Sequence, residues 1–285
     1  MTVPQRLCIV HLPSEHEFAW RHALTDSAFK LGWSSWDYVA GQNNPLGLHQ
    51  DAVIHFSDAR DVAAFAPTAT VIVGATPNEA VRTLMSRFDI DELAALRSSA
   101  RVFAFASDMA EAGVPVVDGL NVTANFPVLG EVTRGANSSV ELPPTKLGDP
   151  LAFFDSLPAV VGAQAVWRPA LFQWMSGDEP GVADLTGRTR ILQHGPYLDL
   201  SSGAWTIEVK FTISLHRAKV DLRFEWGTGH DVQSSTQIFD KSGCYSITLT
   251  KQWLEPGVGE LRVWLDRAMF DGGLVIEDCA VTKIG

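Results

Sequence analysis

The chain has 285 residues, 46% of them apolar, so it is long enough to form two hydrophobic cores and too apolar for general disorder. Its net charge of −11 is spread over both halves, which excludes a basic face for nucleic acid and disfavours anionic lipid. No apolar run approaches the roughly 20 residues of a membrane-spanning helix, and we expect a cytoplasmic protein without membrane insertion.

The N-terminal segment is predicted to form one strand and one helix. Residues 6–12 are an apolar run bounded by prolines, which favours a buried strand over a signal peptide. Ser14 and Glu17 have the spacing of a capping box, which predicts a helix start. Apolar residues then recur at helical spacing, at Trp20, Leu24, Ala28 and Leu31. Gly32 is suited to end that helix.

Short apolar runs then alternate with helical segments. Strands are predicted at residues 52–56, 69–73, 101–106 and 114–117. Thr76 and Pro77, at the cap and the first helical position, mark a helix start between two of these strands. Strands separated by helices of about ten residues predict parallel pairing with right-handed crossovers. Residues 1–130 are therefore predicted to be a Rossmann-like α/β domain.

The helix starts of this half define a candidate ligand site. We expect Ser57, Thr76 and Ser107 to meet at the carboxyl edge of the sheet, where free backbone N–H groups favour anions. Neither the dinucleotide nor the phosphate-loop glycine signature occurs there, and Gly74 stands alone. Helix capping and ligand binding therefore both remain open for these residues. No cofactor is predicted.

The remaining chain is predicted to contain a linker, residues 131–160, and a β-sandwich, residues 161–285. In residues 204–213, apolar Trp205, Ile207 and Val209 alternate with polar residues, so one face is buried and the other is hydrated. The alternation recurs in later segments, and Gly-rich turns separate them. Such a series of strands predicts an antiparallel, jelly-roll-like sandwich.

Residues 184–211 carry a resemblance to a known group of modules. This stretch, with Gly195-Pro196-Tyr197 and the alternating strand after it, resembles the opening of a β-sandwich module found with bacterial surface-polysaccharide glycosyltransferases. The resemblance covers roughly residues 181–285 and implies a carbohydrate-binding jelly roll with a glycan partner. The N-terminal half is similar in outline to one Rossmann-like lobe of a two-lobed glycosyltransferase. A single lobe leaves no facing wall for a sugar-nucleotide donor.

Tryptophans are the candidate glycan-binding residues of the sandwich. Trp205 and Trp226 share the parity of aliphatic strand residues, which predicts burial. Trp264 is out of phase with its aliphatic neighbours and should point outward beside Arg262 and Asp266. A ring with a donor and an acceptor beside it is suited to a sugar. Packing of the sandwich against the other half is an equally open explanation for Trp264.

Catalytic and metal-binding patterns are weak in this sequence. Asp89 and Asp91 match the D-x-D pattern that holds a metal and a diphosphate donor in some glycosyltransferases. The same acids fit the start of a helix, and we favour that interpretation. Cys8, Cys244 and Cys279 lie in strand patterns and are interpreted as reduced thiols. No catalytic residue and no metal site is predicted.

Two functional hypotheses follow from these patterns. The first is a noncatalytic carbohydrate-recognising or scaffolding protein of bacterial polysaccharide assembly, in which the sandwich binds a glycan and the α/β half docks a protein partner. The alternative is a glycosyltransferase-like transferase that uses the carboxyl edge near Ser57, Thr76 and Ser107. The nucleotide-binding glycine signatures that would support the transferase do not occur in the sequence, and this absence is what favours the first hypothesis.

Overall fold

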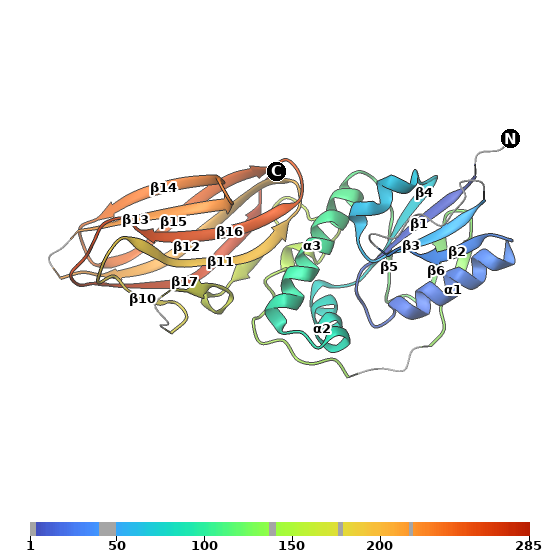
Figure 1. Cartoon of the computed structure of the whole chain (residues 1–285), viewed down its shortest axis with the longest axis horizontal. Coiled ribbons are helices and arrows are strands. Elements are labelled where there is room, and N and C mark those ends of the chain that lie inside the picture. The colour runs from blue at the N-terminus through green and yellow to red at the C-terminus, as the bar shows by residue number, and fades with distance from the viewer. Residues whose placement is uncertain (1–3, 40–49, 137–140, 176–178, 217–218) are drawn as a thin grey trace. The chain divides into compact units, whose positions relative to one another are not determined.

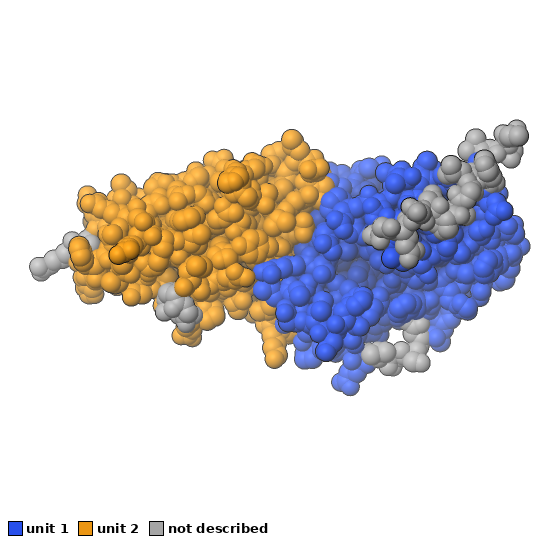
Figure 2. All heavy atoms as spheres, in the orientation of Figure 1, with its two compact units in different colours: residues 1–144 blue, residues 145–285 orange. Residues whose placement is uncertain are grey.

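The computed structural model describes residues 4–39, 50–136, 141–175, 179–216 and 219–285. It divides the chain into two compact units, residues 1–144 and residues 145–285, which Figure 2 shows in blue and orange. The division lies inside the segment 131–160, which the sequence predicts to be a linker and of which residues 137–140 lie outside the described residues.

The first unit contains a parallel sheet, its helices and a small hairpin (Figure 1). Its strands are β1 (Arg6–His11), β2 (Ser34–Asp37), β3 (Ala52–Phe56), β4 (Ala69–Gly74), β5 (Val116–Asp118), β6 (Thr123–Phe126) and β7 (Gly130–Thr133). Its helices are α1 (Glu17–Lys30), the 3₁₀ helix η1 (Ala59–Phe65), α2 (Pro77–Phe88) and α3 (Glu92–Glu111).

The five-stranded sheet has the order β2-β3-β1-β4-β5, and its strand pairs are parallel. The prediction of a parallel sheet is confirmed, while its assignment as a Rossmann domain stays a prediction. β1 lies in the centre of the sheet, with β3 beside it on one side and β4 on the other. The order of the strands therefore reverses at β1. Open parallel sheets place ligand crevices at the carboxyl ends of the strands beside such a reversal.

The core of this unit forms between the sheet and α1. Leu7 and Ile9 of β1 belong to one buried cluster with Trp20, Leu24 and Ala28 of α1. The alternation of β1 and the helical spacing of α1 therefore bring their apolar residues to a shared interface. The apolar stripe predicted for α1 is confirmed except at Leu31, because the helix ends at Lys30.

Residues 101–106, predicted to be a strand, belong to α3 instead. Asp91 caps this helix with a hydrogen bond from the Ala94 N–H to its Oδ1 (2.8 Å), and no glycine or proline interrupts the chain before Gly113. A short apolar run cannot by itself distinguish a buried strand from a buried helix. Ser107 consequently lies buried inside α3 and not at the start of a helix.

The capping box predicted at Ser14 and Glu17 is also wrong. α1 begins at Glu17, and His16 occupies the cap position without a side-chain hydrogen bond. The Glu17 carboxylate binds two arginines, Arg21 and Arg87, and so does not turn back to the backbone. In these two contacts both partners are charged, whereas a capping box pairs the carboxylate with a neutral backbone N–H.

The second unit is built from strands and two short 3₁₀ helices. Its strands are β8 (Gln164–Trp167), β9 (Gln173–Trp174), β10 (Val182–Asp184), β11 (Arg190–Leu200), β12 (Gly203–Ser214), β13 (Val220–Thr228), β14 (Asp231–Phe239), β15 (Gly243–Trp253), β16 (Gly257–Leu265) and β17 (Gly273–Lys283). The 3₁₀ helices are η2 (Ala152–Phe154) and η3 (Pro169–Leu171).

These strands form two antiparallel sheets that pack face to face. One has the order β10-β17-β12-β15 with β8 beside β17, and the other has the order β14-β13-β16-β11-β9. Phe211 of the first sheet contacts Phe224 of the second, with ring centroids 5.1 Å apart. Trp205 and Trp226 are fully buried, as their parity predicts. The predicted antiparallel sandwich is confirmed. Among the described residues, no helix is long and apolar enough to span a membrane.

Candidate functional site

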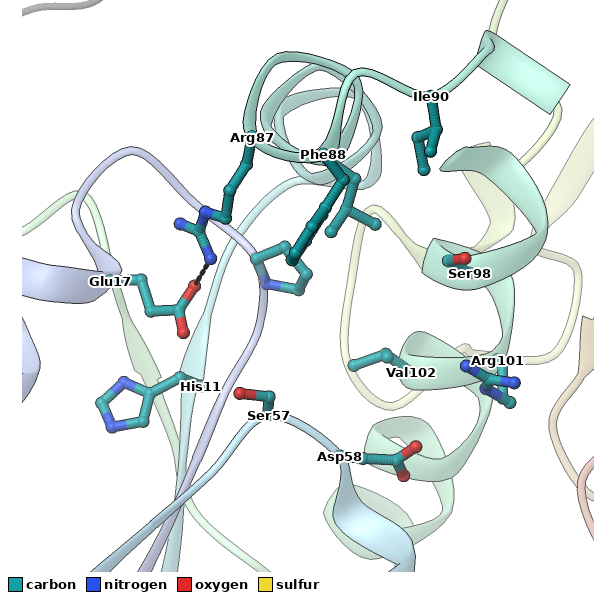
Figure 3. Close-up of a pocket in the computed structure, with 12 residues that line it drawn as sticks. His11, Glu17, Ser57, Asp58, Arg87, Phe88, Ile90, Ser98, Arg101 and Val102 are labelled. Atoms are coloured by element: carbon teal, nitrogen blue, oxygen red, sulfur yellow. Dashed lines mark hydrogen bonds and ion pairs between the residues drawn. The ribbon is translucent and has the colours of Figure 1, made fainter. Parts of the chain in front are cut away.

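A pocket of about 420 Å³ opens in the first unit at the carboxyl ends of β1 and β3 (Figure 3). Ser57 and Asp58 line it just after β3, and Arg87 and Phe88 line it from the last turn of α2. Arg101 lines it from α3. The pocket therefore lies at the edge of the sheet where parallel α/β folds place ligands.

Apolar side chains form much of the pocket wall. Leu84 of α2, Val102 of α3 and Ile90 between these helices are among them. Figure 3 shows Phe88 and Val102 extending from α2 and α3 into the space between these helices and the strand ends. Phe88 is 61% exposed, so its ring offers a flat surface to a molecule that enters. A wall of this kind is typical of sites for small molecules.

A buried carboxylate joins two arginines at one side of the pocket. Glu17 is 4% exposed and accepts hydrogen bonds from Arg21 Nε (3.0 Å) and Arg87 Nη1 (2.6 Å). Figure 3 marks the Arg87 contact with a dashed line. Arg21 continues the network to Asp37 and donates to Ser57 Oγ (2.9 Å). This network fixes the position of the first turn of α1 against the ends of β3 and α2.

The other charged side chains of the pocket differ in their partners. Asp58 accepts from Arg60 Nε (2.9 Å) and Nη2 (2.7 Å), so its charge is already compensated. Arg101 is exposed and has no ion-pair or hydrogen-bond partner within the part of the chain that the structure describes. Among the residues that the structure describes, no carboxylate thus compensates the charge of Arg101.

Two histidines lie beneath α1, and one of them, His11, lines the pocket. His11 Nε2 is 2.9 Å from His55 Nδ1, and both rings are buried. Burial lowers the pKa of both, well below the ordinary value for His11 and to about 4 for His55. Figure 3 shows the His11 ring turned away from Phe88, Ile90 and Val102. The pair is therefore neutral at pH 7, and a lowered pKa makes each imidazole a weaker base than an exposed histidine.

The structure separates the three residues predicted to meet at this edge. Ser57 lines the pocket and is exposed. Thr76 caps α2, where its Oγ1 accepts from the Glu79 N–H (3.2 Å), and it does not line the pocket. Ser107 is buried within α3 because the predicted strand before it does not exist. Only Ser57 thus remains at the predicted site.

The start of α1 is occupied by a carboxylate of the chain itself. Glu79 Oε1 accepts from the backbone N–H of Glu15 (3.1 Å), just before α1 begins. Burial raises the pKa of Glu79, and the Glu15 N–H acts in the opposite direction. A phosphate bound at this turn would have to displace that carboxylate. The backbone N–H of Glu15 is therefore already occupied at this turn.

Sequence patterns gave no sign of the pocket-lining residues on α2 and α3. Arg87 and Phe88 end a helix and resemble ordinary surface residues in the sequence, and Arg101 falls in a run predicted to be a strand. The helical spacing of Arg101 and Val102 relative to Ser98 is the only signal that places these residues on adjoining helix faces. This spacing is informative only if residues 98–102 are helical, and the sequence predicts a strand from residue 101.

The D-x-D pair has a structural role. Asp91 caps α3, and Asp89 ends α2 with a positive φ of 50°. The favoured interpretation, that these acids lie at the start of a helix, is confirmed for Asp91 and wrong for Asp89, which ends the preceding helix. Among the described residues, no group of three His, Cys, Asp or Glu side chains is arranged to hold a metal ion.

The second candidate surface is the outer face of the β14-β13-β16-β11-β9 sheet. Trp264 of β16 is half-buried there and pairs across the ladder with Arg223 of β13. The Arg223 guanidinium lies 4.6 Å from the Trp264 ring centroid, and Trp264 Nε1 donates to Glu225 Oε2 (2.9 Å). The ring is therefore held in one orientation by a cation–π contact and a hydrogen bond.

The predicted neighbours of Trp264 share this face but have partners of their own. Asp266 accepts from Arg223 Nε (2.9 Å), and Arg262 donates to Glu260 Oε2 (2.5 Å). Arg262 also lies 3.7 Å from Glu225 Oε2, which connects it to the carboxylate that holds Trp264. The structure thus places Trp264, Arg262 and Asp266 in one ionic network.

The fold defines a protein of two units, an α/β unit with a parallel sheet and an antiparallel β-sandwich unit. No protein-family model and no curated protein matches the chain.

Among solved structures the chain is similar to carbohydrate-binding modules. A family 61 module in complex with β-1,4-galactotriose is 11% identical, with a TM-score of 0.28, and the match covers 42% of this chain and 82% of that one. The CBM22-1 xylan-binding domain of Xyn10C from Paenibacillus barcinonensis is 12% identical, with a TM-score of 0.26, and the match covers 43% and 83%. The CBM36-1 domain of a xylanase from the hindgut metagenome of Trinervitermes trinervoides is 10% identical, with a TM-score of 0.28, and the match covers 43% and 98%. TM-scores of this size are too low to transfer a ligand or a site to this chain.

Proposed function

We propose that the chain is a noncatalytic carbohydrate-recognising protein and that the outer face around Trp264 binds the glycan. One observation carries this proposal: a half-buried indole on an outer sheet face, held in a fixed orientation among charged side chains. Sugar C–H faces stack on flat rings, and sugar hydroxyls bind carboxylates and guanidinium groups. Arg223, Glu225 and Arg262 supply such groups around Trp264.

The ionic network favours binding because it preorganises the face. Arg223 binds both Glu225 and Asp266, so its guanidinium cannot move freely over the ring. A side chain that is already ordered loses little entropy when the ligand arrives. A sugar would therefore meet a ring whose orientation has been fixed before binding.

The proposal extends to the setting of the protein and to its first unit. The resemblance of residues 184–211 to modules of bacterial surface-polysaccharide enzymes supports a cytoplasmic role in polysaccharide assembly. In this role the sandwich recognises the glycan, and the parallel-sheet unit docks a protein partner.

The pocket at the carboxyl edge favours the second candidate function, a glycosyltransferase-like transferase. The Glu79 carboxylate on the Glu15 N–H counts against it, because a donor diphosphate would bind at such a backbone group. Titration with a sugar nucleotide distinguishes the two candidates. Saturable binding at micromolar concentration would support the transferase, and its absence would support the noncatalytic protein.

A glycan array with wild-type protein and the Trp264→Ala variant tests the proposal. We expect the variant to bind the recognised glycans several-fold more weakly, since a stacked ring is worth about 0.5–1.5 kcal/mol beyond its buried area. Its thermal stability should fall only modestly because the ring is half-buried and fills no cavity. Trp226→Ala, at a fully buried ring, should instead cost about 3–5 kcal/mol of unfolding free energy.

Phe270→Ala is the matched control for this experiment. Phe270 is 99% exposed and lies in the loop between β16 and β17, so the change removes an exposed ring that is not on the strands of the proposed face. Its array profile should equal that of the wild type. Unchanged glycan binding by Trp264→Ala, on an array that the wild type recognises, would overturn the proposed site.

A further inference from the structure

The pocket of the first unit combines an apolar wall with an uncompensated cation. Phe88, Val102 and Leu84 give it apolar surface, and its volume of about 420 Å³ is large enough for a small organic molecule. Pockets of this composition bind molecules with an apolar body and few polar groups. The charged side chains of the pocket then determine which polar group the ligand carries.

The carboxylates of the pocket are already bound by arginines of the chain. Glu17 is shared by Arg21 and Arg87, and Asp58 is bound by Arg60. Arg101 adds a further positive charge with no described partner. Arg21 also binds Asp37, so the pocket and the side chains bound to it hold four arginines (Arg21, Arg60, Arg87 and Arg101) and three carboxylates (Glu17, Asp37 and Asp58). The pocket therefore favours an anion over a neutral molecule or a cation.

Two backbone sites of this unit do not compete for an anion in the pocket. The N–H of Glu15 before α1 binds Glu79, and the first N–H groups of α2 lie at Thr76, which does not line the pocket. Recognition of an anion here therefore depends on the arginine side chains.

We propose that this pocket binds a small organic anion, a carboxylate or a phosphate monoester attached to an aromatic or apolar group. Arg101 contacts the anionic group, while Arg87 stays bound to Glu17 on the other side of the pocket. The Phe88 ring and Val102 contact the apolar body. This inference is independent of glycan binding by the sandwich, because it concerns the other unit of the chain.

Calorimetric titration of the full chain with four matched probes tests the proposal. Benzoate and phenyl phosphate carry the two anionic groups, benzamide is neutral and benzylamine is cationic. We expect a dissociation constant of about 0.1–1 mM for at least one anion and binding about tenfold weaker for benzamide and benzylamine. The tighter of the two anions identifies the carboxylate or the phosphate as the natural group.

Variants connect the binding to the named residues. Arg101→Gln should weaken the anion about tenfold and leave benzamide unchanged, because it removes only the charge. Phe88→Ser should weaken all probes that bind. Lys30→Gln, at an exposed basic residue in the last turn of α1, removes a charge elsewhere in the same unit and should change nothing.

The proposal is wrong if neither anion binds, if benzamide binds as tightly as the anions, or if Arg101→Gln leaves anion affinity unchanged. Circular dichroism melting of each variant shows that it is folded. Arg101 and Phe88 are both exposed, so neither substitution removes a core contact.

Discussion

The buried histidine pair beneath α1 is held in its neutral form. His55 Nε2 lies 3.2 Å from Ser35 Oγ and 3.4 Å from Thr25 Oγ1, so hydroxyl groups and His11 surround it. Burial is the main cause of its lowered pKa, and the positive charge of Arg21 acts in the same direction. Protonation of either ring would place a charge where the structure offers no carboxylate in direct contact.

This pair predicts a loss of stability in mild acid. In the folded protein the pKa of His55 is about 4, below the value near 6.5 in the unfolded chain. Between these values the unfolded state binds protons that the folded state does not, so stability falls as the pH falls from about 6.5 to about 4. Urea unfolding of wild type and His55→Gln over this range measures it. The variant should show the shallower pH dependence.

The size of the effect is of the order of 3 kcal/mol at the lower end of that range. His22→Gln is the control for the loss of one imidazole, because the His22 side chain is 82% exposed and lies outside the buried pair. Carboxylates that titrate in the same range contribute equally to the pH dependence of the wild type and of both variants, so they cancel in the comparison. Parallel pH profiles for wild type and His55→Gln would contradict the account of the buried pair.

At the element scale, the end of β5 approaches the end of β4 too closely for a side chain. The Gly119 N–H donates to the Gly74 carbonyl oxygen (3.1 Å), and the Gly119 carbonyl oxygen accepts from Trp20 Nε1 (2.9 Å). A Cβ added at Gly119 would lie 2.2 Å from that Gly74 oxygen. The close approach connects β4, β5 and α1 through backbone atoms.

We therefore expect Gly119→Ala to destabilise the protein by about 1–3 kcal/mol, the usual range for steric overpacking. The reason is the contact with backbone, which cannot move aside as a flexible side chain does. Gly135→Ala is the control, since nothing lies within 4 Å of its Cβ position. Chemical denaturation compares the two. Equal stability of both variants would show that the strand ends adjust without cost.

The elements also show where sequence patterns were sufficient. Alternation identified the sandwich strands and the outward orientation of Trp264, because a period of two assigns each residue to a face. The cap at Thr76 and the stripe of α1 were predictable from local chemistry. The run 101–106 was not, because its apolar residues are buried in a helix that packs against other elements. Tertiary packing, which the local pattern does not contain, decided between strand and helix.

At the scale of the whole molecule, each candidate site depends on contacts between segments distant in the sequence. Glu17 and Arg87 meet across 70 residues, and Trp264 meets Glu225 across 39. The parity of Trp264 and the position of Ser57 were predictable from local patterns, but these distant partners were not. The predicted neighbours Arg262 and Asp266 lie on the same face as Trp264. The residues that contact its ring, however, are Arg223 and Glu225.

The central claim is that the face around Trp264 binds a glycan, and an indole N–H resonance of this residue tests it directly. The chain has nine tryptophans, and Trp264→Phe identifies the resonance of Trp264 in an isotope-labelled sample. Its N–H donates to Glu225, so a sugar that stacks on the ring or competes for the carboxylate must change its surroundings. During titration with a glycan selected on the array, the account predicts a saturable shift of the Trp264 resonance, while that of fully buried Trp205 stays in place. A stationary Trp264 resonance in a protein that binds the glycan would contradict it.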